Sequence, residues 1–173
     1  MRRPDLSGLP GLPTPRSGWT LRTLRSDDAN ELASFANVLQ KAFADESWTP
    51  EKAFTALPGD PTVQTTFVIL NGPEIIATAS ARLLPERYPG SGYVHWVAAD
   101  PAFAGQGLGH AVTLAVLHEF VRLGCHDSVL TTDDFRLPAI KTYWNLGFRP
   151  DFTHESQRER WASVTAQLFP SIK

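Results

Sequence analysis

A glycine-rich turn at Ala104–Gly109, AGQGLG, constrains this 173-residue chain more than any other feature. Before it, GYVHWVAAD at 92–100 has the β-branched and aromatic content of a strand. After it, the strongly apolar stretch 108–123 ends before Gly124, a residue typical of a helix stop. A strand that passes through a tight turn into a long helix predicts a crossover unit, and therefore a parallel pair of strands in the sheet.

The residues ahead of the turn predict that the sheet begins antiparallel. WTLRTL at 19–24 alternates like a strand, and an amphipathic helix follows it with Asp27 as the N-cap. A short second helix is predicted within 48–57. The β-rich runs TVQTTFVIL at 62–70 and EIIATASARLL at 74–84 are separated only by Asn-Gly-Pro, which predicts a hairpin.

The residues after the turn complete the predicted fold. SVLTT at 128–132 indicates a short strand, 138–146 a helix, Phe148 the start of a last extended stretch, and 155–169 a final amphipathic helix. We therefore expect an α/β (α+β mixed) fold, with a central mixed, mostly antiparallel sheet and helices on both faces.

Composition limits the domain organisation and the class of protein. Residues 1–18 are dense in Pro and Gly and predict a flexible tail, which leaves 19–173 as a single domain. With 16 basic against 18 acidic residues, the chain has no electrostatic footprint for nucleic acid. Its apolar runs are far shorter than the ~20 residues of a membrane span, and prolines interrupt any secretory signal, so we expect a cytoplasmic protein. The single cysteine, Cys125, excludes an internal disulfide and is interpreted as a structural thiol.

The glycine turn suits a diphosphate, because side-chain-free residues at a helix start let an anion approach the main-chain N–H groups. The glycines alone fit equally well a tight turn with no ligand. A dinucleotide fingerprint fails, because the last glycine position falls on His110 when counted from Gly105 and on Val112 when counted from Gly107. A P-loop also fails, because no lysine followed by a hydroxyl residue comes after the glycines.

The residues on either side of the glycine turn favour a bound ligand. VAADPAFAGQGLGHAVTLAVL, from Val97 to about Leu117, resembles the acetyl-CoA loop of the GNAT superfamily of N-acetyltransferases, in which V-x-P leads to R/Q-x-x-G-x-G/A. The chain departs from that pattern at Ala104, where the family usually has Arg or Gln. Because main-chain N–H groups hold most of the phosphate charge in that family, we expect binding to be weakened and not lost.

A second segment, PAIKTYWNLGF at 138–148, resembles the family pattern A-x-x-x-Y-x-x-x-G-F. Ala139, Tyr143 and the Gly-Phe pair are in register with it. Arg136 departs, because many members have there an Asn that contacts the pantetheine arm. LTTDDFRLPAIKTYWNLGF together with HESQRERW is also similar to a mycothiol-synthase-like branch of the family.

The resemblance implies a GNAT-like acyl-CoA N-acyltransferase fold, with acetyl-CoA as acyl donor and direct attack by a primary amine in a ternary complex. It implies that a main-chain N–H within 96–99 stabilises the oxyanion and that Tyr143 is the general acid. The residues that it implies for cofactor binding are Val97, Ala98, Ala99, Ala104, Gly105, Gln106, Gly107, Leu108, Gly109, His110, Arg136, Ala139 and Tyr143.

The amine must also lose a proton. Alternation along the strand places Tyr93, His95 and Val97 on one face, and an imidazole suits general-base catalysis, so His95 is the second predicted catalytic residue. The alternatives are Asp133, Asp134 and Glu155. No metal is predicted, because adjacent aspartates mark turns and helix starts and have no histidine at ligand spacing.

The acceptor stays open between an amine of a small molecule and an amine of a peptide, and the sequence leaves open a homodimer. Two other hypotheses compete. The missing Arg or Gln at Ala104 fits a non-catalytic acyl-CoA sensor, against which Tyr143 argues. A longer acyl group would need a deeper cleft than Trp96 suggests.

Overall fold

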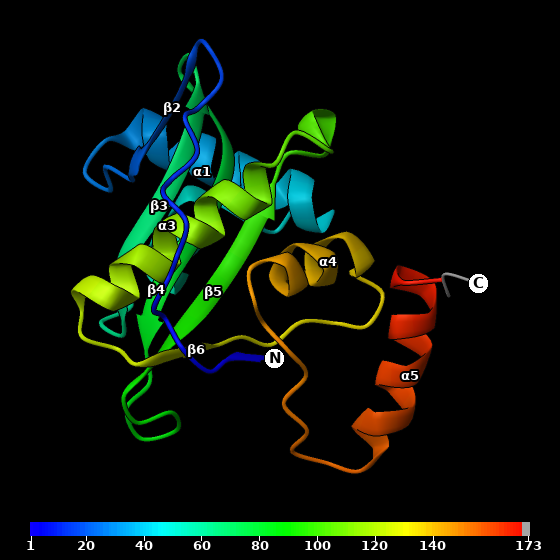
Figure 1. Cartoon of the computed structure of the whole chain (residues 1–173). Helices are drawn as coiled ribbons and strands as arrows, with labels where there is room; N and C mark the ends of the chain where they lie inside the picture. Colours follow the sequence, from blue (N-terminus) through cyan, green and yellow to red (C-terminus); the bar gives the residue numbers. More distant parts are fainter. Residues whose placement is uncertain (171–173) are drawn as a thin grey trace.

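The fold is known from a computed structural model that describes residues 1–170. Within that range one six-stranded sheet has the order β1-β6-β5-β4-β3-β2 (Figure 1). All neighbouring strands are antiparallel except β5 and β6, which confirms the mixed, mostly antiparallel sheet. The strands are β1 Arg2–Arg3, β2 Trp19–Thr23, β3 Val63–Asn71, β4 Glu74–Leu83, β5 Ser91–Ala99 and β6 Asp127–Val129.

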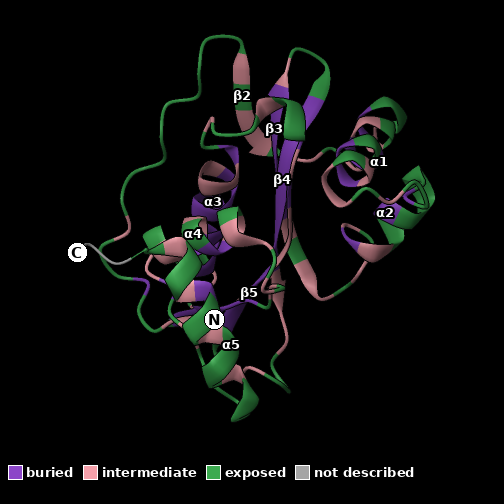
Figure 2. Cartoon of the chain, turned by 90° about the vertical axis from the view of Figure 1, so that its right-hand side faces the viewer, coloured by how far each residue is buried: buried purple, intermediate pink, exposed green. Residues whose placement is uncertain are grey.

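Helices cover both faces of the sheet, as predicted. Those that the structure describes are α1 Ala29–Phe43, α2 Pro50–Ala56, α3 Leu108–Arg122, α4 Leu137–Asn145 and α5 Ser156–Leu168, with a short 3-10 turn η1 at Pro101–Phe103. Figure 2 shows α1 and α2 on one side of the sheet and α3 on the other. Each side has its own apolar layer, one built around Phe35 and Leu39 of α1 and the other around Leu117 and Phe120 of α3.

The start of α1 lies one residue later than predicted. Asp28, and not Asp27, is the N-cap: its carboxylate accepts hydrogen bonds from the N–H groups of Asn30 and Glu31. Glu31 is itself buried and accepts from the side chains of Arg22 and Arg25, which, with the Arg25 N–H, lower its pKa to about 2. These ion pairs fix β2 against α1.

The amino-terminal segment differs from the expected tail. Arg2 and Arg3 add β1 to the edge of the sheet beside β6, and the Arg2 guanidinium pairs with Asp127 and Asp151. The Leu6 side chain is only 5% exposed within the α3-side core. Composition does not predict these contacts, because the partners of Arg2 lie more than a hundred residues away in the sequence. The following residues 10–18 are exposed.

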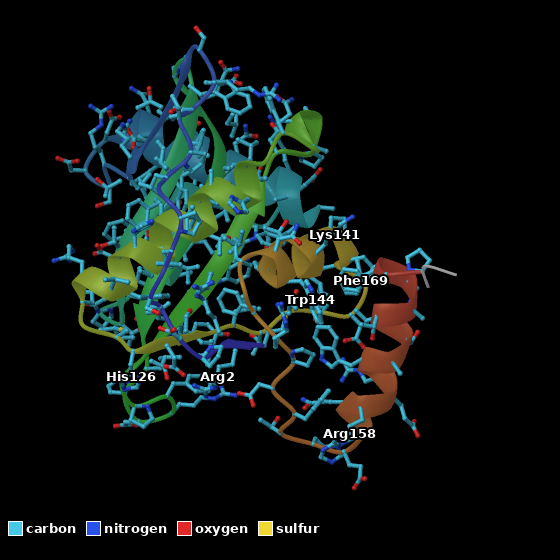
Figure 3. The ribbon with its side chains drawn as sticks, in the orientation of Figure 1. Arg2, His126, Lys141, Trp144, Arg158 and Phe169 are labelled. Carbon is cyan, nitrogen blue, oxygen red and sulfur yellow. The ribbon has the colours of Figure 1, made fainter. Side chains whose placement is uncertain are left out.

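The carboxyl-terminal part forms its helix but not its expected extended stretch. After α4 only a single bridge joins Arg149 to Arg2, and no strand begins at Phe148 within the described residues. Figure 3 shows Trp144 of α4 facing Phe169 beyond α5, with ring centroids 5.0 Å apart. None of the described helices has the length and apolarity needed to span a membrane.

Candidate active site

The glycine turn presents a row of free main-chain donors. Gly105 and Gly107 have φ of 74° and 77°, a left-handed conformation that glycine adopts without strain. The first hydrogen bond of α3 runs from Ala111 N–H to Gly107 C=O. Among residues 1–170, the N–H groups from Gly105 to His110 have no hydrogen-bond acceptor.

Space in front of these donors is open. A Cβ added at Gly105, Gly107 or Gly109 would meet no other atom within 4 Å. Among the described residues no side chain caps the start of α3, and the positive end of the helix dipole lies at this turn. The loop is therefore built to receive an anion, which is the property required of a diphosphate site.

Strand β5 carries a bulge directly before the turn. Thr78 pairs with Ala98 while Ser80 pairs with His95, so two residues of β5 lie opposite one residue of β4. Trp96 is at the bulge and has a φ of 46°, an uncommon conformation for a bulky residue. The bulge reverses the order in which side chains of β5 alternate between the two faces of the sheet. Val97 therefore packs toward α3, and the prediction that it shares a face with His95 is wrong.

The other edge of β5 is open over its second half. β6 pairs with β5 only from Ser91 to Tyr93, so Val94–Ala99 has no strand beside it on that edge within the described chain. This explains why the predicted strand at 128–132 ends at Val129: the chain leaves β5 there and continues to α4. The main chain of the bulge thus faces the side on which α4 lies.

Tyr143 lies on α4 and is 6% exposed. Burial raises the pKa of its hydroxyl to about 12, an effect that the nearby Arg136 guanidinium opposes. Its ring packs edge-on against Phe148 at 6.1 Å, which accounts for the spacing of the Tyr and the Gly-Phe pair. Within residues 1–170 no hydrogen bond contributes to the pKa of the Tyr143 hydroxyl.

The second predicted catalytic residue, His95, lies beside the Arg82 guanidinium. Its Nε2 lies 3.2 Å from Nη1 of Arg82, which can only donate, so Nε2 is the acceptor and has no free lone pair. Burial and the Arg82 charge lower the pKa of His95 to about 4, despite the opposing charge of Asp60. The side chain is thus a contact of Arg82, and its role as general base stays a prediction. The alternating polar residues of β4 were the sequence signal for this pair.

The alternative carboxylates are also engaged or remote. Asp133 pairs with Arg136 at 3.0 Å and Asp134 with Arg160 of α5 at 2.6 Å. Glu155 is exposed before α5. Within residues 1–170, no three His, Cys, Asp or Glu side chains gather in a way that could hold a metal ion.

Aromatic side chains surround the bulge. The Trp96 ring packs edge-on against Phe43 at 5.0 Å and against Trp48 at 4.8 Å. The Arg136 guanidinium lies over the Phe43 ring at 4.9 Å, so the start of α4 meets the end of α1 beside the bulge. The sequence gives no signal for Phe43 at this site, because its helical spacing is that of an ordinary core residue.

The remaining predicted positions divide between core and loop. Ala98 and Leu108 are buried, and Ala99 and Ala139 pack at the edge of the α3-side core. Ala104 is exposed.

A cavity of about 180 Å³ lies against Gln106, Gly107, Leu108 and His110. A larger cavity, of about 270 Å³, lies between the end of β6 and α5, and neither Tyr143 nor the glycine turn lines it. Cys125 is half-buried, and burial raises the pKa of its thiol, as fits a structural residue.

The region thus combines free main-chain donors at a helix start, a bulged strand with an open edge, and a buried tyrosine on α4. The chain belongs to the acetyltransferase (GNAT) family, whose sequence model matches residues 30–148.

Relatives and solved structures agree with this assignment. The chain is 31% identical to mycothiol acetyltransferase of a Nocardioides species over 91% of its length and 59% of the relative's, and 34% identical to that of Actinosynnema mirum over 86% and 50%. It thus spans about half the length of these curated relatives. Ribosomal-protein-S18-alanine N-acetyltransferase of Escherichia coli superposes with a TM-score of 0.62 at 21% identity, over 78% of this chain and 79% of that one. Glucosamine-6-phosphate N-acetyltransferase of Arabidopsis thaliana gives 0.62 at 18% identity, over 79% and 95%. The predicted GNAT-like fold is confirmed.

Proposed function

We propose that this protein transfers the acetyl group of acetyl-CoA to a primary amine of a small molecule or peptide. The observation that carries the proposal is the row of unpaired N–H groups from Gly105 to His110, facing open space. Such a row would hold the CoA diphosphate, and the open edge of β5 would receive the pantetheine arm as far as the bulge. The thioester carbonyl oxygen would then lie near the main chain around Trp96, whose N–H groups supply the oxyanion contact.

The chemistry follows from the environment of Tyr143. The amine nitrogen bonds to the thioester carbon, the C–S bond breaks, and the sulfur takes the proton of the Tyr143 hydroxyl. Because the pKa of this hydroxyl is about 12, the tyrosinate left behind is a strong base, and it recovers a proton from the nitrogen through water. In this scheme no proton has to pass to His95, whose Nε2 accepts a hydrogen bond from Arg82.

The proposal extends to the identity of the amine that accepts the acetyl group. The curated relatives are named mycothiol acetyltransferases, so we propose a small-molecule amine of the kind those enzymes acetylate as the first acceptor to test. A panel of small and peptide amines, with acetyl-CoA and a colorimetric readout of free thiol, identifies it. Turnover above the rate of acetyl-CoA hydrolysis with one amine establishes the activity.

The exposed Ala104, which leaves the turn without the Arg or Gln usual in the family, favours a second candidate, the non-catalytic acyl-CoA sensor. The same assay separates the two. A sensor binds acetyl-CoA in calorimetry but releases no thiol with any amine, whereas a protein that shows no binding contradicts both functions.

A further inference from the structure

The exposed end of the amino-terminal segment lies across the glycine turn. Figure 1 shows the segment after β1 running along α3 toward β2. The His118 Nε2–H of α3 donates to the carbonyl of Pro10 at 2.8 Å, which attaches the segment to the helix. Further on, Nη1 of Arg16 donates to Oε1 of Gln106 at 2.8 Å. Gln106 is in the middle of the row of free N–H groups.

The cavity of about 180 Å³ described above lies between this segment and the turn. Pro13, Thr14, Pro15 and Arg16 line it from the segment, and Gln106 to Leu108 line it from the turn. Arg16 is the only lysine or arginine among the lining residues. The turn itself supplies none, because no Lys or Arg occurs from residue 100 to residue 110.

The charge of Arg16 is free for a ligand. Within residues 1–170 no carboxylate pairs with Arg16, in contrast to Arg2, Arg22 and Arg160. The bond to Gln106 uses one of the five N–H groups of the guanidinium. Trp19 holds the group in place, with its ring centroid 5.6 Å from Cζ of Arg16.

We propose that Arg16 binds the diphosphate of acetyl-CoA and supplies, from the amino-terminal segment, a cation that the turn lacks at Ala104. The inference rests on the proposed function. A guanidinium presents paired N–H groups that match two phosphate oxygens, and main-chain donors alone would leave much of the diphosphate charge unbalanced. The contact with Gln106 places this group where the row of N–H groups places the diphosphate.

Calorimetry with three ligands tests the proposal. Arg16→Ala should raise the Kd of CoA about tenfold, because it removes a charge-assisted contact at a solvent-exposed site. The same factor is expected for 3′-dephospho-CoA, which keeps the diphosphate, and no change is expected for pantetheine. Arg16→Lys should recover part of the affinity. The control is Arg158→Ala, which replaces an exposed arginine in the first turn of α5 (Figure 3) and should leave all three affinities unchanged.

Salt gives an independent readout. Raising the ionic strength should weaken CoA binding more steeply in the wild type than in Arg16→Ala, because one ionic contact is missing in the variant. Thermal unfolding of each variant shows whether it is folded, and Arg16→Gln serves if the alanine variant is not.

The outcomes separate this inference from the proposed function. Wild-type binding of CoA with an unchanged Kd in folded Arg16→Ala overturns the role of Arg16 and leaves the acetyltransferase intact. If Arg16→Ala weakens the binding of CoA but not of 3′-dephospho-CoA, the diphosphate assignment is overturned, because the arginine would then bind the 3′-phosphate. Absence of CoA binding in the wild type contradicts the proposed function itself.

Discussion

Two titratable side chains, the buried Tyr143 and the half-buried His95, have different surroundings and therefore different properties. Tyr143 is enclosed by apolar neighbours with no hydrogen-bond partner for its hydroxyl among the described residues, so burial keeps its proton in place. His95 is enclosed beside the Arg82 cation, so burial and charge together keep it neutral. Tyr143 is therefore protonated before the reaction, as a proton donor must be, and His95 is a neutral partner of Arg82.

Tyr143→Phe tests the proton donor. We expect kcat to fall about a hundredfold, the order of a lost general acid, while the Kd of acetyl-CoA stays within twofold. Stability should change little, because the hydroxyl forms no bond that the phenylalanine would lose. Steady-state kinetics and calorimetry measure the two quantities. Full turnover at saturating substrates would exclude Tyr143 from the chemistry.

The lowered pKa of His95 predicts how the free energy of unfolding depends on pH. An unfolded histidine takes up its proton near pH 6.5, whereas folded His95 does so only near pH 4 because its pKa is lowered to about 4. The unfolded chain therefore binds more protons in this window, and the free energy of unfolding should fall as the pH drops from 6.5 to 4, by about 1–2 kcal/mol after allowance for the partly exposed ring.

Urea unfolding at several pH values checks this. His95→Gln keeps an acceptor for Arg82 and should remove most of the fall, whereas the exposed His154→Gln should not. His95→Gln should also keep kcat within about threefold at neutral pH, and a loss of the hundredfold order would return His95 to the role of base.

At the scale of elements, the start of α3 combines a conformational and an electrostatic function. The turn needs glycine at 105 and 107, where φ is positive. Gly109 is different: it lies inside the first turn of the helix, its φ is not in the left-handed region, and the space around it is open. The third glycine therefore serves ligand access and not the turn.

Gly109→Asp separates stability from binding. An acidic residue in the first turn of a helix is favoured by the helix dipole, and replacing a helical glycine removes about 0.5–1 kcal/mol of destabilisation, so the variant should unfold at or above the wild-type temperature. The new carboxylate should nevertheless raise the Kd of CoA at least tenfold by repelling the diphosphate. Gly109→Ala is the matched control, with the same stability and a smaller loss of affinity. Equal affinity in all three proteins would contradict the diphosphate site.

At the scale of the molecule, the amino-terminal segment connects parts that are far apart in the sequence. Its first residues extend the sheet beside β6, Leu6 enters the core, and the last part reaches the glycine turn. This packing explains how a segment rich in Pro and Gly can be ordered: it joins an existing core and does not need one of its own.

Two leucines of this segment form a matched pair. Leu6→Ala should lower the free energy of unfolding by about 2–3 kcal/mol, because it leaves a cavity in the α3-side core. Leu12 is 48% exposed, and Leu12→Ala should change stability by less than about 0.5 kcal/mol. Chemical denaturation measures both. Equal stabilities would support the free tail that composition predicts.

The sequence by itself determined most of the helices and strands from Trp19 onward and their order, and it located the glycine turn and Tyr143. Those features are local: caps, periodicity and glycine spacing fix φ and ψ within a few residues. Only the tertiary structure decided that β1 completes the sheet, that a bulge at Trp96 reverses the alternation of β5, that Arg82 occupies His95, and that Arg16 reaches Gln106. Each of these depends on two segments distant in the chain coming into contact, and a pattern within either segment contains no information about the position of the other.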